Sequence, residues 1–143
     1  MITIDANLII YAHHSTAPQH VPARKWFEQV LSGFEPVRLA WSTIHAFLRI
    51  ATHPSIFPKA FSIGDAHSLV EDWLAQPSVA LLEPGERYWE IFGRLLTSGQ
   101  ARGNLVMDAH LAALAIEHGA TLFTTDRDFS RFEGLRLSNP LAG

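Results

Sequence analysis

Apolar positions along the chain fall into two patterns, short continuous runs and longer stretches with helical spacing. The short runs predict buried strands, and the last of them is a short edge strand. In chain order, the expected strands are Met1–Ile4, Val37–Trp41, Val79–Leu82, Thr121–Thr124 and Leu135–Leu137.

Between these runs, apolar residues recur at helical spacing and polar or glycine residues mark the ends. The expected helices are Asn7–Tyr11, Arg24–Leu31, Ser42 to about Thr52, a helix from Ser62, Pro84 to about Thr97, and Leu105–His118. Ser42 and Ser62 are read as N-caps, and Asp65 completes a capping box with Ser62. Gly119 stands where a C-terminal glycine cap belongs. Strands that alternate with helices predict an α/β fold with a mostly parallel sheet covered on both faces.

Size and composition agree with one soluble domain. The chain has 143 residues, 48% of them hydrophobic, which is ample for a single core. No apolar run is long enough to predict a membrane span, and the N-terminus lacks the pattern of a secretory signal. The absence of cysteine excludes disulfides, thiolate metal sites and cysteine nucleophiles, so a cytoplasmic setting is expected.

The net charge of -3 does not by itself indicate nucleic-acid binding, which depends strongly on basic side chains. A nucleic-acid substrate would need a bound cation or a local basic patch. Nine of the eleven basic residues are arginine, which suits bidentate phosphate contacts.

Four aspartates are placed where a parallel sheet forms its site, beyond the carboxyl ends of the strands. Asp5 follows the first strand directly, and Asp126 and Asp128 follow the fourth. Asp108 lies in the first turns of the helix that leads into the fourth strand. Topology therefore allows all four to meet at one end of the sheet.

Carboxylates that crowd together repel one another, and a divalent cation relieves that repulsion. Mg²⁺ and Mn²⁺ prefer oxygen ligands and support phosphoryl chemistry by orienting the phosphate and activating water. Besides metal binding, structural roles remain open for the four aspartates. Asp5 could cap the following helix, Asp108 could complement the helix dipole, and Asp126 and Asp128 could be turn residues.

The remaining polar and aromatic residues suggest no second site. The histidines are expected to be structural or at the surface, with His13 and His14 exposed, and the tryptophans to be core or interface anchors. Other acidic residues are expected on solvated helix faces; these are Glu28, Glu71, Asp72, Glu86, Glu90 and Glu117.

Three segments in order resemble PIN domains. They are Ile2–Asn7 (ITIDAN), Met107–Ala115 (MDAHLAALA), and His118–Leu122 followed by Thr124–Phe129 (TTDRDF). The segment Ile44–Pro54 (IHAFLRIATHP) is similar to VapC toxins of bacterial toxin–antitoxin modules, in particular mycobacterial ones.

The resemblance implies one PIN domain over residues 1–143, an α/β/α sandwich with a central, mostly parallel sheet of four to five strands. It further implies a homodimer that cleaves RNA, often transfer or ribosomal RNA, with Mg²⁺ or Mn²⁺. A VapB-type antitoxin would block the site by inserting a segment near it.

By position in the resembling motifs, Asp5 and Asp108 would be the main metal ligands and catalytic residues, with Asp126 as a further acid. Asp128 would assist or only hold the loop. Asn7 and Thr125 fall where the family braces its carboxylates. Four arginines are candidate contacts to phosphate or antitoxin: Arg49, Arg102, Arg127 and Arg131.

One departure from the family pattern concerns the helix after the second strand, where PIN domains commonly carry a glutamate. Ala46 occupies that place, and no Asp or Glu occurs between Glu35 and Asp65. We therefore expect weaker metal binding without substrate, and a single ion until the substrate phosphate arrives. The alternative is a catalytically weakened PIN-fold module that binds RNA or protein.

A phosphoacceptor receiver domain also groups aspartates around Mg²⁺, but it needs an Asp at the end of strand three and a Lys near the last strand. Strand three ends in Leu82-Glu83-Pro84, and the only lysines are Lys25 and Lys59. That alternative is disfavoured.

Overall fold

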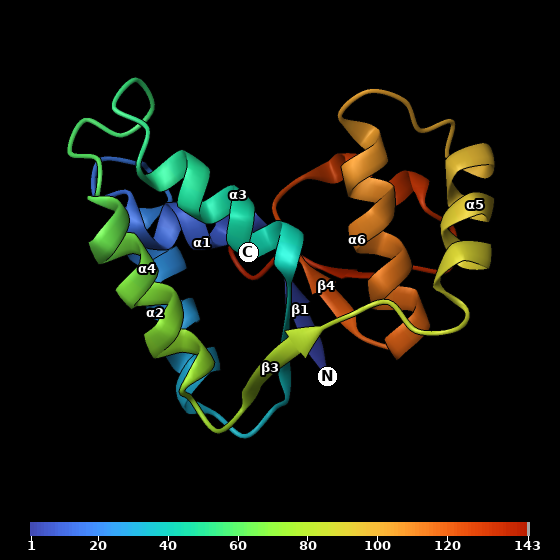
Figure 1. Cartoon of the computed structure of the whole chain (residues 1–143), viewed down its shortest axis with the longest axis horizontal. Coiled ribbons are helices and arrows are strands. Elements are labelled where there is room, and N and C mark those ends of the chain that lie inside the picture. Colours follow the sequence, from blue (N-terminus) through green and yellow to red (C-terminus); the bar gives the residue numbers. More distant parts are fainter. Residues whose placement is uncertain (143) are drawn as a thin grey trace.

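Five parallel strands form the centre of the molecule in the order β3-β2-β1-β4-β5 (Figure 1). The computed structural model describes residues 1–142, and Gly143, the last residue of the predicted domain, lies outside them. The strands are β1 Ile2–Ile4, β2 Val37–Ala40, β3 Val79–Leu82, β4 Thr121–Phe123 and β5 Arg136–Ser138. The expected α/β class with a mostly parallel sheet of four to five strands is confirmed, and the sheet has five strands, all parallel.

The first strand is the middle of the sheet. Ile2 pairs with Val37 on one side and with Thr121 on the other, and all three residues of β1 are buried. A strand covered on both faces cannot alternate apolar with polar residues, which explains its continuous apolar run. The edge strand β5 is largely exposed, in keeping with its weak pattern.

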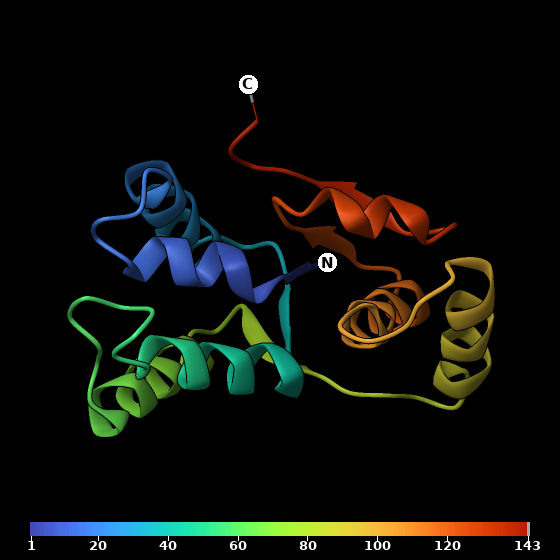
Figure 2. The same cartoon turned by 90° about the horizontal axis from the view of Figure 1, so that it is seen from above.

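Helices cover the sheet as two groups, seen on either side of the strands in Figures 1 and 2. Their bounds are α1 Ala6–His13, α2 His20–Ser32, α3 Trp41–Ala51, α4 Ile63–Leu74, α5 Tyr88–Ser98 and α6 Leu105–His118, with a 3-10 helix η1 at Arg127–Arg131. One apolar cluster joins α1 to α4 with β1, β2 and β3, and a second joins α5, α6 and η1 with β4. The result is an α/β sandwich.

Two of the predicted helix ends are confirmed by their hydrogen bonds or backbone angles. Ser62 Oγ accepts the N–H of Asp65 at 3.0 Å, and Gly119 closes α6 in the left-handed region with φ 69°. The N-cap expected at Ser42 is wrong, because the helix begins two residues earlier than that cap requires. Trp41 opens α3 instead of ending β2, and Ala40 takes the N-cap position without a side-chain bond.

Other helix boundaries differ at the N-terminal side. The second helix starts at His20 instead of Arg24, because the expected loop ends earlier. The fifth starts at Tyr88 instead of Pro84. The preceding loop is held by Glu117, whose carboxylate accepts the N–H groups of Gly85 at 2.7 Å and Arg87 at 2.9 Å.

That contact corrects the expectation that Glu117 is solvated, since only 8% of its side chain is exposed. The expectation that His13 is exposed is also wrong. Its ring lies among those of Phe27, Phe47 and Trp73, with centroids 5.2 to 5.7 Å away. Its Nδ1 lies 2.7 Å from the carbonyl oxygen of Ile9. Tertiary packing that is invisible in the sequence partly buries both residues.

Across residues 1–142, no helix combines the length and the apolar character that crossing a membrane requires.

Candidate active site

Asp5 stands at the carboxyl end of the central strand, in the N-cap position of α1. Its side chain makes no N-capping hydrogen bond. Instead, Oδ2 accepts the hydroxyl of Thr124 at 2.8 Å, and the same Thr124 oxygen accepts the N–H of Asp126 at 3.0 Å. The hydroxyl therefore ties the end of β1 to the end of β4 and orients the Asp5 carboxylate.

Asp126 combines a structural role with its place near the site. Its Oδ1 accepts the N–H of Asp128 at 2.8 Å, which caps η1. The turn interpretation of Asp126 is therefore confirmed, and Asp128 is exposed on the same turn.

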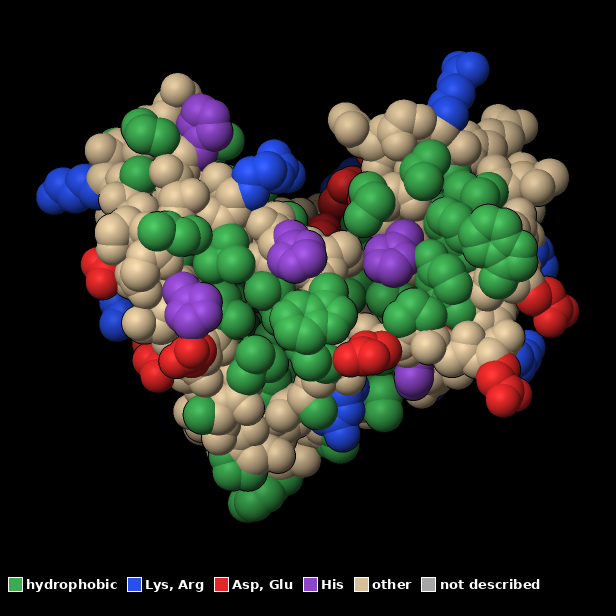
Figure 3. All heavy atoms as spheres, viewed as in Figure 1, with side chains coloured by type: hydrophobic (Ala, Val, Ile, Leu, Met, Phe, Trp, Pro, Cys, Tyr) green, Lys and Arg blue, Asp and Glu red, His purple; other side chains and the backbone are tan. Residues whose placement is uncertain are grey.

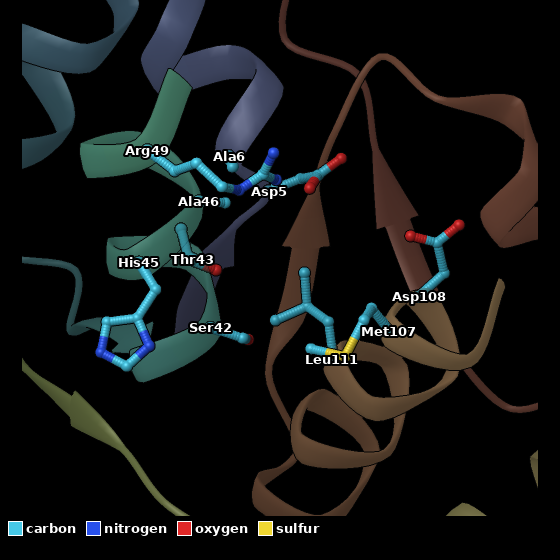
Figure 4. Close-up of a pocket in the computed structure, with 10 residues that line it drawn as sticks. All are labelled: Asp5, Ala6, Ser42, Thr43, His45, Ala46, Arg49, Met107, Asp108 and Leu111. Atoms are coloured by element: carbon cyan, nitrogen blue, oxygen red, sulfur yellow. The ribbon is translucent and has the colours of Figure 1, made fainter. Parts of the chain in front are cut away.

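Asp5 and Asp108 face the same cavity, of about 470 Å³ (Figure 4). One wall comes from α3 and the other from α6, with Asp5 between them. From α3 the lining residues are Ser42, Thr43, His45, Ala46 and Arg49, and from α6 they are Met107, Asp108 and Leu111. On the molecular surface the same face is hollowed between two lobes, with acidic side chains at the base (Figure 3).

The carboxylates of this site repel one another. Burial, followed by the charges of Asp5, Asp126 and Asp128, raises the pKa of Asp108 to about 6, and Arg131 partly opposes this. Burial also raises the pKa of Asp5, and the Thr124 hydrogen bond counteracts the effect. Bringing these carboxylates together therefore destabilises their ionised forms, and a bound cation would offset this repulsion.

The donor set fits a hydrated hard cation. Within residues 1–142, no three His, Cys, Asp or Glu side chains converge closely enough to bind one ion by themselves. Mg²⁺ commonly keeps several waters beside one or two carboxylates, and Asp5 with Asp108 offers that arrangement. The donors that softer metals favour are few in this cavity, where His45 offers imidazole nitrogen and Met107 a thioether sulfur.

The sequence profile described as the PIN domain matches residues 2–135. The chain belongs to the PIN-domain family. It is 44% identical to Ribonuclease VapC37 of Mycobacterium tuberculosis over 99% of both chains. It is 38% identical to Ribonuclease VapC43 of the same species over 100% of this chain and 97% of that one. The resemblance to mycobacterial VapC proteins is thereby confirmed.

Solved structures show the same fold. VapBC-1 from nontypeable Haemophilus influenzae matches with a TM-score of 0.70 at 21% identity, covering 99% of this chain and 100% of that chain. VapBC2 from Rickettsia felis, solved with a DNA fragment from its promoter, matches with a TM-score of 0.69 at 19% identity, covering 97% and 98%. Both are complexes of a VapC with a VapB.

In this PIN domain, Ala46 lines the α3 wall of the cavity, where its methyl group replaces any carboxylate. Arg49 lines the same wall, one helical turn further on. Its guanidinium makes no ion pair with any residue in the described part of the chain. That wall therefore carries positive instead of negative charge.

The other sequence-predicted residues divide among different surfaces. Asn7 donates to Thr125 Oγ1 at 3.0 Å, and its buried Oδ1 has no partner within residues 1–142. Arg127 lines a separate cavity with Thr125 and Asp126. Arg102 and Arg131 line a third one, beside the α5–α6 loop.

Sequence reasoning missed Thr124, which orients Asp5. The signal was present, because Thr124 directly follows β4, beside the end of β1. It was overlooked because hydroxyl residues are common at strand ends, and only the sheet order places this one next to Asp5.

Proposed function

We propose that this PIN domain is a metal-dependent endoribonuclease and the toxin of a toxin–antitoxin pair. The observation that carries the proposal is the shared cavity of Asp5 and Asp108, in a chain 44% identical over its length to a protein named Ribonuclease VapC37. The substrate class follows from that relative's name, and transfer or ribosomal RNA is the expected target.

Asp5 and Asp108 would hold Mg²⁺ or Mn²⁺, with Asp126 and Asp128 acting through water. The ion would supply the charge that activates water and stabilises the developing oxygens. Thr124 keeps the Asp5 carboxylate turned toward the cavity through its 2.8 Å hydrogen bond. The pKa of Asp108, about 6, leaves this carboxyl mostly ionised at neutral pH, so it is available as a ligand.

The test is cleavage of an RNA panel that includes transfer and ribosomal RNA, with Mg²⁺ or Mn²⁺ against EDTA. Asp5→Asn and Asp108→Asn each remove a charge with little change in shape, and both should abolish cleavage. Asp72→Asn, on the exposed face of α4, is the matched control and should cleave normally. Full activity in either site variant, or cleavage in EDTA, would refute the assignment.

RNA binding without cleavage by the wild-type chain would instead support the catalytically weakened module. Ala46→Glu then becomes informative, because it restores a carboxylate on the α3 wall. We expect this variant to reach half-maximal cleavage at a lower Mg²⁺ concentration than the wild type.

A VapB-type antitoxin is the proposed partner, since the structural relatives are VapBC complexes. Co-purification with the product of a neighbouring small gene, and loss of cleavage in that complex, would support this pairing. An activity that the bound partner leaves unchanged would contradict it.

We also propose a homodimer through the face shown in Figure 3. Hydrophobic side chains gather there over α3, α6 and α5. Trp41 is 46% exposed, Met107 55% and Trp89 74%, which is unusual for side chains of this size. Light scattering should give twice the monomer mass, and Trp41→Ser should reduce it to the mass of one chain.

A further inference from the structure

The third cavity, of about 590 Å³, lies beside the loop that joins α5 to α6. Its lining residues are Leu96, Gln100, Ala101, Arg102, Leu105 and Arg131. Both charged residues among them are arginines, whereas the neighbouring site is dominated by aspartates. This cavity therefore offers local positive charge on a chain whose net charge is -3.

Arg131 connects this cavity to the acidic site. Its Nη1 donates to the carbonyl oxygen of Gly99 at 3.0 Å, and its Nε donates to that of Asp128 at 3.3 Å. Neutral carbonyl groups fix the guanidinium without cancelling its charge. Arg131 is also the cation whose charge acts on Asp108, so the two sites are electrostatic neighbours.

Arg102 is exposed, and its side chain makes no hydrogen bond or ion pair within residues 1–142. It is therefore available for a ligand. The first turn of α6 begins at Leu105 on the same cavity, and Asn104 provides no side-chain cap. The positive end of this helix adds to the charge of the two arginines.

We propose that Arg102 and Arg131 form a phosphate subsite that binds a backbone phosphodiester of the RNA strand flanking the scissile phosphate. This inference rests on the proposed ribonuclease function. Arginine can donate two parallel N–H groups to a phosphate. The hydrogen bonds to the carbonyl oxygens of Gly99 and Asp128 fix the position of the Arg131 guanidinium before a ligand binds. Asp108 lines the acidic cavity and Leu105, one turn earlier on α6, lines this one, so an RNA strand bound at Asp108 would reach these arginines with a neighbouring phosphate. The subsite offsets the repulsion that the aspartates impose on RNA.

The test is equilibrium binding of a short single-stranded RNA in EDTA, so that cleavage is neither needed nor possible. We expect Arg102→Ala to weaken binding about fivefold at about 0.1 M salt, and to reduce the slope of log K against log salt by about 0.7. The double variant with Arg131→Ala should reduce that slope by about 1.4. Arg102→Lys keeps the charge and should keep the wild-type slope.

Arg87→Ala is the matched control. Arg87 is exposed at the opposite end of α5, and its guanidinium makes no hydrogen bond or ion pair among the described residues. The Arg87→Ala variant should bind RNA with the wild-type slope of log K against log salt. Arg102→Ala tests the proposal even if Arg131→Ala disturbs the η1 turn, because Arg102 makes no contact that folding needs.

The proposal is overturned if Arg102→Ala and the double variant bind RNA as the control does, or if the wild type shows no salt-dependent binding. Loss of antitoxin binding with unchanged RNA binding would assign the cavity to an acidic protein segment and overturn it as well. Saturation by low millimolar inorganic phosphate would mark a site for the free ion instead. If the chain binds RNA with the expected salt slopes but cleaves none, the phosphate subsite is supported and the proposed nuclease function is contradicted.

Discussion

Asp108→Asn should separate catalysis from stability, because it removes a negative charge that burial and neighbouring carboxylates make unfavourable in the folded chain. In the metal-free protein, burial and then the neighbouring aspartates raise the pKa of Asp108 from 3.8 to about 6. Between these two values the folded chain binds more protons at this position than the unfolded chain. The wild type therefore loses stability as pH rises through that window, whereas the variant does not.

The magnitude follows from the size of the pKa difference. If the whole pKa difference acted on stability, it would lower the free energy of unfolding by about 3 kcal/mol at neutral pH. Asp108 is only half-buried, so water screens its interactions, and we expect about 1 kcal/mol. For a chain of this length, that gain raises Tm by about 2–4 °C.

The assay is thermal and urea unfolding in EDTA at about pH 7.5 and at about pH 4, with Asp72→Asn as the control. The variant should be the more stable protein at the higher pH and equal to the wild type at the lower one. Added Mg²⁺ should stabilise the wild type more than the variant, which shrinks the difference. A variant less stable than the wild type in EDTA at the higher pH, or an advantage independent of pH, would refute the electrostatic reasoning.

Three further predictions concern the rest of the fold. Glu117→Ala should lower the free energy of unfolding by about 1–3 kcal/mol, measured in urea, because two N–H groups of the β3–α5 loop lose their acceptor; an unchanged value would contradict that role. Gly99→Ala should lower the free energy of unfolding by about 1–3 kcal/mol, since a Cβ there would lie 2.8 Å from a carbonyl oxygen and 2.9 Å from an aromatic ring. A Cβ at Gly93 would meet nothing within 4 Å, so Gly93→Ala should stabilise α5 by about 0.5–1 kcal/mol. Equal effects in the two glycine variants would contradict the packing argument. Burial lowers the pKa of His13, so the unfolded chain takes up its proton first and stability should fall as pH drops below about 6.5. His13→Phe should lose less stability over that range, and an identical loss in urea titrations would show that His13 is not responsible.

Local patterns in the sequence were sufficient for the element types. The run at Ile2–Ile4 forms the buried strand β1 as expected, and Leu105–His118 forms a helix with the predicted bounds. Its length and the glycine that follows it identify this helix, because its buried residues lie on more than one face. Helix starts were less certain. Trp41 extends the apolar run of β2 yet begins α3, since nothing local distinguishes the last residue of a buried strand from the first residue of a buried helix.

The sequence by itself determined the candidate aspartates, since each follows a strand or begins a helix that the apolar pattern locates. Only the tertiary structure decided what surrounds them. The sheet order places β4 beside β1, which brings the Thr124 hydroxyl to Asp5, and helix packing turns Glu117 and His13 inward. Burial, pKa and hydrogen-bond partners depend on residues that are far apart in the chain, such as Asp5 and Thr124, and no local pattern carries that information.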